Sequence, residues 1–264
     1  MNHLVNYVAE GGIATLTLND PPVNAYTHEM MKELDEAIIE ARFDNDVQVI
    51  VLTGHGEKFF CAGANIGMLR EVDPTFKYYF CLHANETLSR LEHTPKLVIA
   101  AINGHCVGGG LEIALACDLR VARRDAGKLG LPEVMLGVLP GTGGTQRLTR
   151  AVGKTRAMQL MLEGETFSFE RAEELGLVNH IVEAETASEF LAEVHGYARR
   201  FTTPRRSPLA IGRIKRSVQS AMEVGLEQGL ALERELQAEL FASDDAAEGL
   251  SAYVEKRVPV FKGS

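Results

Sequence analysis

Residues 108–118 read GGGLEIALACD, in which three glycines lead directly into an apolar helical pattern with a carboxylate, Glu112, in its first turn. Glycine has no Cβ, so a ligand carbonyl can approach the backbone closely at these positions. The first N–H groups of a helix have no partner within the helix and lie at the positive end of its dipole. The stretch therefore predicts a turn and helix start that bind a negatively charged oxygen.

A second carboxylate, Glu133, follows Pro132 in the segment LPEV at residues 131–134. Two carboxylates at one site can act as general acid and general base. Each glutamate also has a plainer interpretation, because a carboxylate near the start of a helix complements the helix dipole. Taken singly, each position favours the plainer interpretation, and the pair becomes a catalytic hypothesis only together with other motifs.

A second glycine-bearing segment, GHGEKFFCAGAN at residues 54–65, directly follows an expected strand. By itself it is better explained as an ordinary strand-to-helix loop. Beside the turn at 108–110 it offers a second source of backbone N–H donors. An oxyanion hole needs two such donors to hold one developing negative charge, so the two segments together predict one.

Alternating strand and helix patterns predict an α/β fold for the first part of the chain. We expect strands at 5–8 and 13–18, joined as a hairpin, and at 47–52, 97–102, 119–122 and 177–182. We expect helices after Thr27, from 74 to about 92, from Gly109, and at 184–201, 207–222, 226–241 and 246–256. The pattern divides the chain into a core of residues 1–200, which holds the active site, and a C-terminal helical region of residues 201–264. This region is expected to pack on its own core or on a neighbouring subunit.

The charge balance restricts the partners of the chain. The 264 residues carry a net charge of −9, whereas nucleic-acid binding needs lysine and arginine clustered on one face, so we expect no nucleic-acid partner. The most basic stretch, residues 199–206, is short. It is interpreted as a solvated helix end and turn, with the binding of an anionic group such as a nucleotide phosphate as the alternative.

The four cysteines form neither a CxxC pair nor zinc-ligand spacing, so we expect no disulfide framework and no metal site. No apolar run approaches the roughly 20 residues of a membrane span. The first residues show neither a basic leader nor an apolar signal core. These features predict a cytoplasmic protein with no membrane partner.

Three segments resemble the enoyl-CoA hydratase/isomerase (crotonase) superfamily, namely FFCAGANI at 59–66, AINGHCVGGGLE at 101–112 and GLPEVMLGVLPGTGGTQRL at 130–148. The resemblance extends from the first strands to the closing segment at 255–262. It implies a crotonase-like β/α spiral core with a C-terminal helical region, an acyl-CoA substrate and no cofactor beyond the coenzyme A of that substrate. It also implies a homotrimer or a dimer of trimers.

Residue by residue, the resemblance assigns the backbone N–H groups of Ala64 and Gly109 to an oxyanion hole for the thioester carbonyl. It assigns Glu112 and Glu133 as the two catalytic glutamates. Further substrate-binding positions lie in or next to the same motifs: Ala62, Asn65, Ile66, Met68, Gly108, Pro132 and Gly141.

Retention of both glutamates favours a hydratase, which adds water across the 2,3 double bond of a 2-enoyl-CoA thioester. Hydration needs a water oriented toward the β-carbon and a proton delivered to the α-carbon, and two carboxylates around one water serve both needs. An isomerase can shuttle a proton with one base. The alternatives are enoyl-CoA isomerisation, thioester hydrolysis or decarboxylation on the same oxyanion hole, and a non-catalytic CoA-binding protein.

Some positions depart from the pattern of the superfamily. Asn65 stands where many relatives have Asp, and residues 67–68 lack a lysine that some hydratases use for the CoA nucleotide. We expect Lys58, or Lys262 of a neighbouring subunit, to take that role. The apolar and aromatic segment 68–80 is the expected acyl pocket, although ordinary helix packing explains it equally well.

Overall fold

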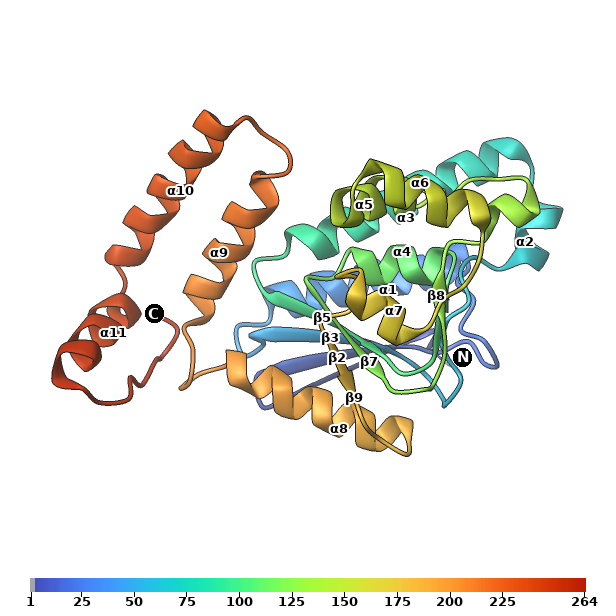
Figure 1. Cartoon of the computed structure of the whole chain (residues 1–264). Coiled ribbons are helices and arrows are strands. Elements are labelled where there is room, and N and C mark those ends of the chain that lie inside the picture. Colours follow the sequence, from blue (N-terminus) through green and yellow to red (C-terminus); the bar gives the residue numbers. More distant parts are fainter. Residues whose placement is uncertain (1–2) are drawn as a thin grey trace.

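A six-stranded sheet forms the centre of the protein (Figure 1). The structure is a computed structural model that describes residues 3–264. Residues 1–2, which belong to the N-terminal segment in which the sequence shows no leader pattern, lie outside the described residues. Strands β1 and β2 form the expected antiparallel hairpin, and the other neighbours in the sheet are parallel. In spatial order the strands are β1 (Val5–Glu10), β2 (Ile13–Leu18), β3 (Val49–Gly54), β5 (Leu97–Ile102), β7 (Leu119–Arg123) and β9 (His180–Val182).

A second, three-stranded parallel sheet lies beside the first and is built from very short strands. Its strands are, in spatial order, β4 (Phe59–Cys61), β6 (His105–Val107) and β8 (Leu129–Gly130). The residues expected at the site follow the ends of these strands, at 62–65 after β4, at 108–112 after β6 and at 132–133 shortly after β8. Because parallel strands end at the same edge of a sheet, this small sheet brings the three motifs together.

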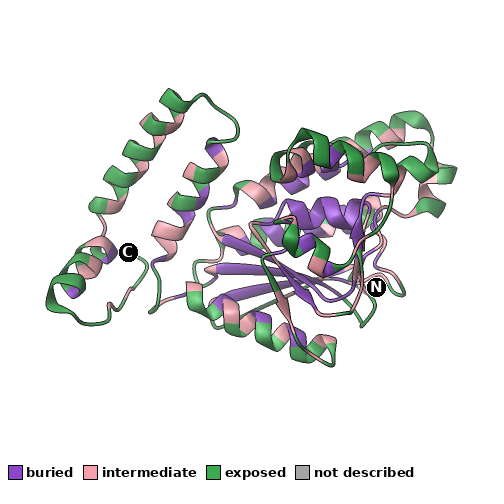
Figure 2. Ribbon diagram, in the orientation of Figure 1, coloured by how far each residue is buried: buried purple, intermediate pink, exposed green. Residues whose placement is uncertain are grey.

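Helices cover both faces of the large sheet (Figure 1). A large core packs helices α1, α3 and α4 on one face, and a smaller core packs Phe190, Val194 and Ala198 of α8 on the other. Buried residues accordingly concentrate in the strands and in α4 (Figure 2). The helices are α1 (His28–Phe43), α2 (Ile66–Glu71), α3 (Pro74–His93), α4 (Gly109–Leu115), η1 (Glu133–Leu136), α5 (Gly144–Val152), α6 (Lys154–Glu163), α7 (Phe169–Glu174), α8 (Ala187–Ala198), η2 (Arg199–Phe201), α9 (Pro208–Ser220), α10 (Leu226–Phe241) and α11 (Asp244–Glu255).

Helix α1 shows why the local sequence signals are reliable here. The Thr27 side chain accepts a hydrogen bond from the N–H of Met30 at 3.3 Å, as an N-cap residue does. The buried side chains that follow recur every three or four residues, which places them on one face of the helix. The helix therefore forms as the spacing predicts and packs this face on the sheet.

The expected strand at 177–182 is shorter in the structure. Leu177 and Val178 are buried, but their N–H groups bond to the carbonyl of Ala172 at the end of α7, at 2.8 and 3.2 Å. They close that helix instead of joining the sheet, so pairing with β7 begins only at His180. The expected helix at 184–201 likewise begins later, at Ala187, and its last residues, 199–201, form a 3-10 turn.

The C-terminal helices α9, α10 and α11 extend to one side of the core (Figure 1). Helix α9 is tied to the core by an ion pair between Lys215 Nζ and Asp118 Oδ2 at 2.8 Å, with both side chains largely buried. Beyond it, large apolar side chains are exposed, among them Leu226 at 76% and Tyr253 at 85%. None of the helices in the described residues is long and apolar enough to cross a membrane. The division at residues 200 and 201 stays a prediction.

Candidate active site

The backbone turns after β4 and β6 touch each other. A Cβ placed on Gly63 would lie 2.9 Å from the backbone N of Gly109, which is closer than real Cβ atoms approach. Gly108 has a φ of 56° and lies against Glu133, because a Cβ on it would be 3.0 Å from Glu133 Oε1. These close approaches explain why the turns are built from glycine.

The N–H groups of Ala64 and Gly109 are free of protein acceptors among residues 3–264. The groups on either side of Ala64 are engaged, because Gly63 O accepts a hydrogen bond from Tyr26 N at 2.9 Å and Asn65 N donates one to Tyr26 O at 3.0 Å. Gly109 is the first residue of α4, where no intrahelical acceptor is available. The two donors that the resemblance assigns to an oxyanion hole therefore come from adjoining turns and are available to a ligand.

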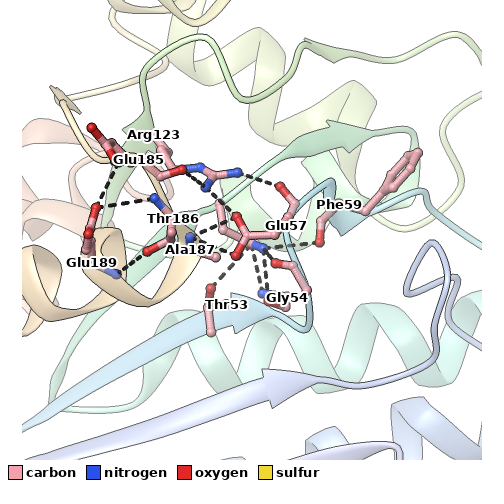
Figure 3. A network of polar contacts seen from close by, with 11 residues as sticks. Thr53, Gly54, Glu57, Phe59, Arg123, Glu185, Thr186, Ala187 and Glu189 are labelled. Carbon is pink, nitrogen blue, oxygen red and sulfur yellow. Dashed lines mark hydrogen bonds and ion pairs between the residues drawn. The ribbon is translucent and has the colours of Figure 1, made fainter.

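The loop that leads into β4 is fixed by a polar network (Figure 3). The Glu57 carboxylate accepts hydrogen bonds from Arg123 at 2.6 Å and from the N–H of Ala187, at the start of α8, at 2.9 Å. The Asn103 side chain donates to Gly54 O at 3.0 Å and to Gly56 O at 2.8 Å. The loop is thus tied to the large sheet and to α8, which limits movement of the turn that carries Ala64.

Glu112 lies in the first turn of α4 and is almost fully buried. Its Oε1 accepts hydrogen bonds from the N–H groups of Thr142 at 2.8 Å and of Gly144 at 2.7 Å. Its Oε2 accepts a short hydrogen bond from the Thr142 hydroxyl. Burial raises the pKa of Glu112, and these three donors act in the opposite direction because they favour the charged form.

Glu133 follows Pro132 in η1 and has a different environment. Its Oε2 is buried and has no hydrogen-bond partner among residues 3–264. Burial, with a contribution from the nearby charge of Glu112, raises the pKa of Glu133 to about 7. The two carboxylates are therefore distinguished by their surroundings: three donors favour the ionised form of Glu112, and the apolar burial of Glu133 favours a proton on it.

The other residues expected at the site lie around these turns. Asn65 is the N-cap of α2, with its Oδ1 accepting from the N–H of Met68 at 3.0 Å. Asp caps helices as well as Asn does, so the departure from the superfamily pattern at this position leaves the local fold unchanged. Gly141 O accepts from Asn85 at 3.3 Å. The remaining expected residues are placed next to the same turns: Ala62 after β4, Ile66 at the exposed start of α2, Gly108 before α4 and Pro132 before η1.

The positively charged side chains considered for binding an anionic group lie on the surface. Lys58 and Lys262 are both exposed, and the four arginines of residues 199–206 are exposed in η2 and in the turn after it. All four cysteines are free. In the described residues, no group of three or more His, Cys, Asp or Glu side chains is arranged to hold a metal ion.

Comparison with known proteins identifies the family of the chain. Residues 8–264 match the sequence model of the Enoyl-CoA hydratase/isomerase family. The chain belongs to this family. A short-chain-enoyl-CoA hydratase of Clostridium acetobutylicum is 38% identical over 249 residues, covering 94% of this chain and 93% of that protein. The 2,3-dehydroadipyl-CoA hydratase of Escherichia coli is 38% identical over 256 residues, covering 95% of each.

Solved structures agree with this membership of the hydratase/isomerase family. An enoyl-CoA hydratase crystal structure from Geobacillus kaustophilus has a TM-score of 0.94 and 44% sequence identity, and the match covers 100% of this chain and 98% of that one. The family and the fold expected from the sequence are therefore confirmed. The expected enzyme class, an enoyl-CoA hydratase, agrees with the names of these relatives.

Two residues at the site of this hydratase/isomerase family member were not expected from the sequence. Tyr26 is 2% exposed, and its hydroxyl lies 3.3 Å from the Thr142 hydroxyl, which also bonds to Glu112. Thr142 lies in the turn that opens α5, which begins at Gly144. The sequence offered one signal for Tyr26, its position directly before the N-cap residue Thr27. A tyrosine that is buried at such a position needs a hydrogen-bond partner for its hydroxyl.

Proposed function

We propose that this chain is an enoyl-CoA hydratase that adds water across the 2,3 double bond of a 2-enoyl-CoA thioester. One observation carries the proposal: a buried glutamate that accepts three hydrogen bonds and a half-buried glutamate whose Oε2 accepts none lie beside the turns that carry two unengaged backbone N–H groups. The named activities of the relatives, a short-chain-enoyl-CoA hydratase and a 2,3-dehydroadipyl-CoA hydratase, support the same reaction class.

The N–H groups of Ala64 and Gly109 bind the thioester carbonyl oxygen in this proposal. Both donors are fixed before substrate arrives, so they stabilise the enolate oxygen without reorganising during the reaction. Removing one donor from such a pair costs roughly 10²- to 10³-fold in rate. Withdrawal of electrons toward the carbonyl also makes the β-carbon open to attack by water.

Glu112 acts as the general base and Glu133 as the general acid. Water adds its oxygen to the β-carbon while one of its protons goes to the ionised Glu112. Glu133 gives its proton to the α-carbon, and the enolate electrons form the new C–H bond. The net change is the addition of one water, and transfer of a proton from Glu112 to Glu133 through solvent restores the starting charges.

The same proposal places substrate along the turns that contain Ala62, Asn65, Ile66, Met68, Gly108, Pro132 and Gly141. We propose that the acyl group lies toward α2 and α3, and that Lys58, or Lys262 of a neighbouring subunit, binds the CoA phosphates. No cofactor beyond the coenzyme A of the substrate takes part. Exposed apolar side chains on α10 and α11 support contact with a neighbouring subunit, and we propose that this assembly is a homotrimer or a dimer of trimers in the cytoplasm.

The test is the purified chain with crotonyl-CoA, followed by loss of the enoyl thioester absorbance and by mass. Gain of one water is expected. The variants Glu112→Gln and Glu133→Gln should each lose most of the turnover while still binding the thioester, whereas Glu173→Gln, at an exposed position on α7, should match the unaltered chain.

Other outcomes would replace the proposal with a named alternative. Near-normal turnover in either glutamine variant would refute the two-glutamate mechanism. A 3-enoyl-CoA converted without change of mass would identify an isomerase, release of free CoA a hydrolase, and loss of carbon dioxide from a carboxylated substrate a decarboxylase. CoA binding without turnover of any thioester would identify a binding protein.

A further inference from the structure

Tyr26 contacts both turns that carry the proposed oxyanion donors. Its backbone is paired with the turn of Ala64, through the hydrogen bonds to Gly63 and Asn65. Its side chain lies against the other turn, because a Cβ on Gly109 would be 2.3 Å from the Tyr26 hydroxyl oxygen. Its ring also stacks on Phe80 of α3 with 5.7 Å between ring centroids. The hydroxyl is therefore held in place by packing on several sides.

The hydrogen bonds of this hydroxyl have a defined direction when Glu112 is ionised. A hydroxyl carries one proton, and an ionised carboxylate can only accept. The Thr142 hydroxyl therefore donates to Glu112 Oε2, so the Tyr26 hydroxyl, 3.3 Å away, must donate to Thr142 Oγ1. Burial and the charge of Glu112 raise the pKa of Tyr26 well above its ordinary value of 10, so its donor proton is always present.

The direction reverses when Glu112 is protonated. Oε1 already accepts two backbone N–H groups, so the added proton belongs on Oε2. Glu112 then donates to Thr142 Oγ1, and the Thr142 hydroxyl is free to turn and donate to the Tyr26 oxygen. Only hydrogen atoms move, because both oxygens of the pair can donate and accept.

We infer that Tyr26 and Thr142 form a positioning pair for Glu112, which holds its carboxylate ionised before water attacks and satisfies its hydrogen bonds after it takes the proton. The inference rests on the proposed function, in which Glu112 is the base. Neither hydroxyl is required to touch substrate. Tyr26 in addition connects the base to the two turns that carry the oxyanion donors.

Two hydroxyl deletions separate this role from packing. Tyr26→Phe keeps the ring and its stacking on Phe80 and removes only the donor to Thr142. Thr142→Ala removes the direct bond to Glu112, and Thr142→Ser restores a hydroxyl. Tyr7→Phe is the matched control, because the Tyr7 hydroxyl is buried without a partner among residues 3–264.

The ionisation of Glu112 is measured without substrate, from the infrared band of its protonated carboxyl group, assigned as the band that Glu112→Gln removes. Loss of a hydrogen bond to a charged group should raise its pKa by about one unit in Thr142→Ala. Tyr26→Phe should raise it less, and Thr142→Ser and Tyr7→Phe should leave it near the value of the unaltered chain. The double variant should match Thr142→Ala alone, because Tyr26 acts through Thr142.

The other titratable groups around Glu112 are unchanged in these variants. They are Arg147 on α5, which lowers its pKa, Glu133 in η1, and Cys81 on α3, whose own pKa is raised by burial and by Glu112. A change in Glu112 ionisation is thus assignable to the hydroxyl pair. In Thr142→Ala the acidic limb of the kcat/KM profile for crotonyl-CoA hydration should shift upward by the same amount, with kcat/KM about tenfold lower below that limb.

Unchanged Glu112 titration in both Tyr26→Phe and Thr142→Ala would overturn the inference, as would additive effects in the double variant. The proposed function fails in a different way. If the unaltered chain does not hydrate crotonyl-CoA, the function is wrong while the infrared titration still decides the pairing. If hydration occurs and depends on Glu112, but the titration is unmoved, only the pairing is wrong.

Discussion

Replacing Glu133 by glutamine should stabilise the fold at alkaline pH. Burial without a hydrogen-bond donor to Oε2 raises the pKa of Glu133 from 4.5 to about 7 in the folded protein. Above pH 7 the folded and unfolded chains both carry the charge, and the folded chain bears the whole cost of burying it. As the pH falls through 7 the folded chain binds a proton, and the cost disappears by about pH 4.5.

The size of the effect follows from the pKa shift. Each unit corresponds to about 1.4 kcal/mol, so the full shift would give about 3 kcal/mol. The side chain is only partly buried, and solvent screening reduces this to about 1–2 kcal/mol. Glu133→Gln, which is neutral at every pH, should therefore have a free energy of unfolding about 1–2 kcal/mol above that of the unaltered chain at pH 8 and much closer to it at pH 5.

Chemical denaturation at pH 5 and pH 8, at one protein concentration, measures this difference. Fixed concentration is needed because self-association would add to the apparent stability. Glu173→Gln serves as the exposed control and should show no such pH dependence. A Glu133→Gln variant that is no more stable than the unaltered chain at pH 8, or that gains equally at both pH values, would refute the reasoning.

Three further predictions concern activity and the C-terminal helices. The kcat/KM for crotonyl-CoA should fall about tenfold between pH 6 and pH 8, because Glu133 of the free enzyme loses its proton through a pKa of about 7, and a flat profile of kcat/KM would contradict its role as acid. Gly109→Ala should lose roughly 100-fold in kcat/KM, because the new Cβ would lie 2.3 Å from a tyrosine hydroxyl and displace an oxyanion donor. Gly196→Ala, which meets nothing within 4 Å in helix α8, should keep full activity in the same assay. Lys215→Met should lower the free energy of unfolding by about 3–5 kcal/mol, measured by denaturation, because it leaves Asp118 buried without its partner; a loss below 1 kcal/mol would show that the pair is not needed.

The elements that local signals define were predictable from the sequence. Helix α10 begins and ends where its apolar spacing predicts, at Leu226 and Phe241, and α3 begins at Pro74 after the cap of Asp73. The turn at 108–110 also follows from local rules, because few residues other than glycine adopt the positive φ of Gly108. Leu177 and Val178 show the limit of such signals, because a short apolar run fits a strand and a buried turn equally well.

The features that depend on distant contacts were not predictable. Strands β4, β6 and β8 have two or three residues each, too few for an alternating pattern to be recognised. Tyr26 and Thr142 are separated by 116 positions, and nothing near either residue indicates the other. The family resemblance pointed to Glu112 and Glu133, but the different surroundings of the two carboxylates became visible only in the structure.

The shortness of the three-stranded sheet has a consequence for how the active site tolerates change. Strands of this length are not stable in isolation, so their positions depend on the large sheet, which holds the chain segments that lead into them. The three motifs continue from one edge of this small sheet. The oxyanion donors and the two glutamates therefore share one support. A substitution that disturbs any strand of this sheet is expected to displace the two oxyanion N–H donors and both catalytic glutamates together.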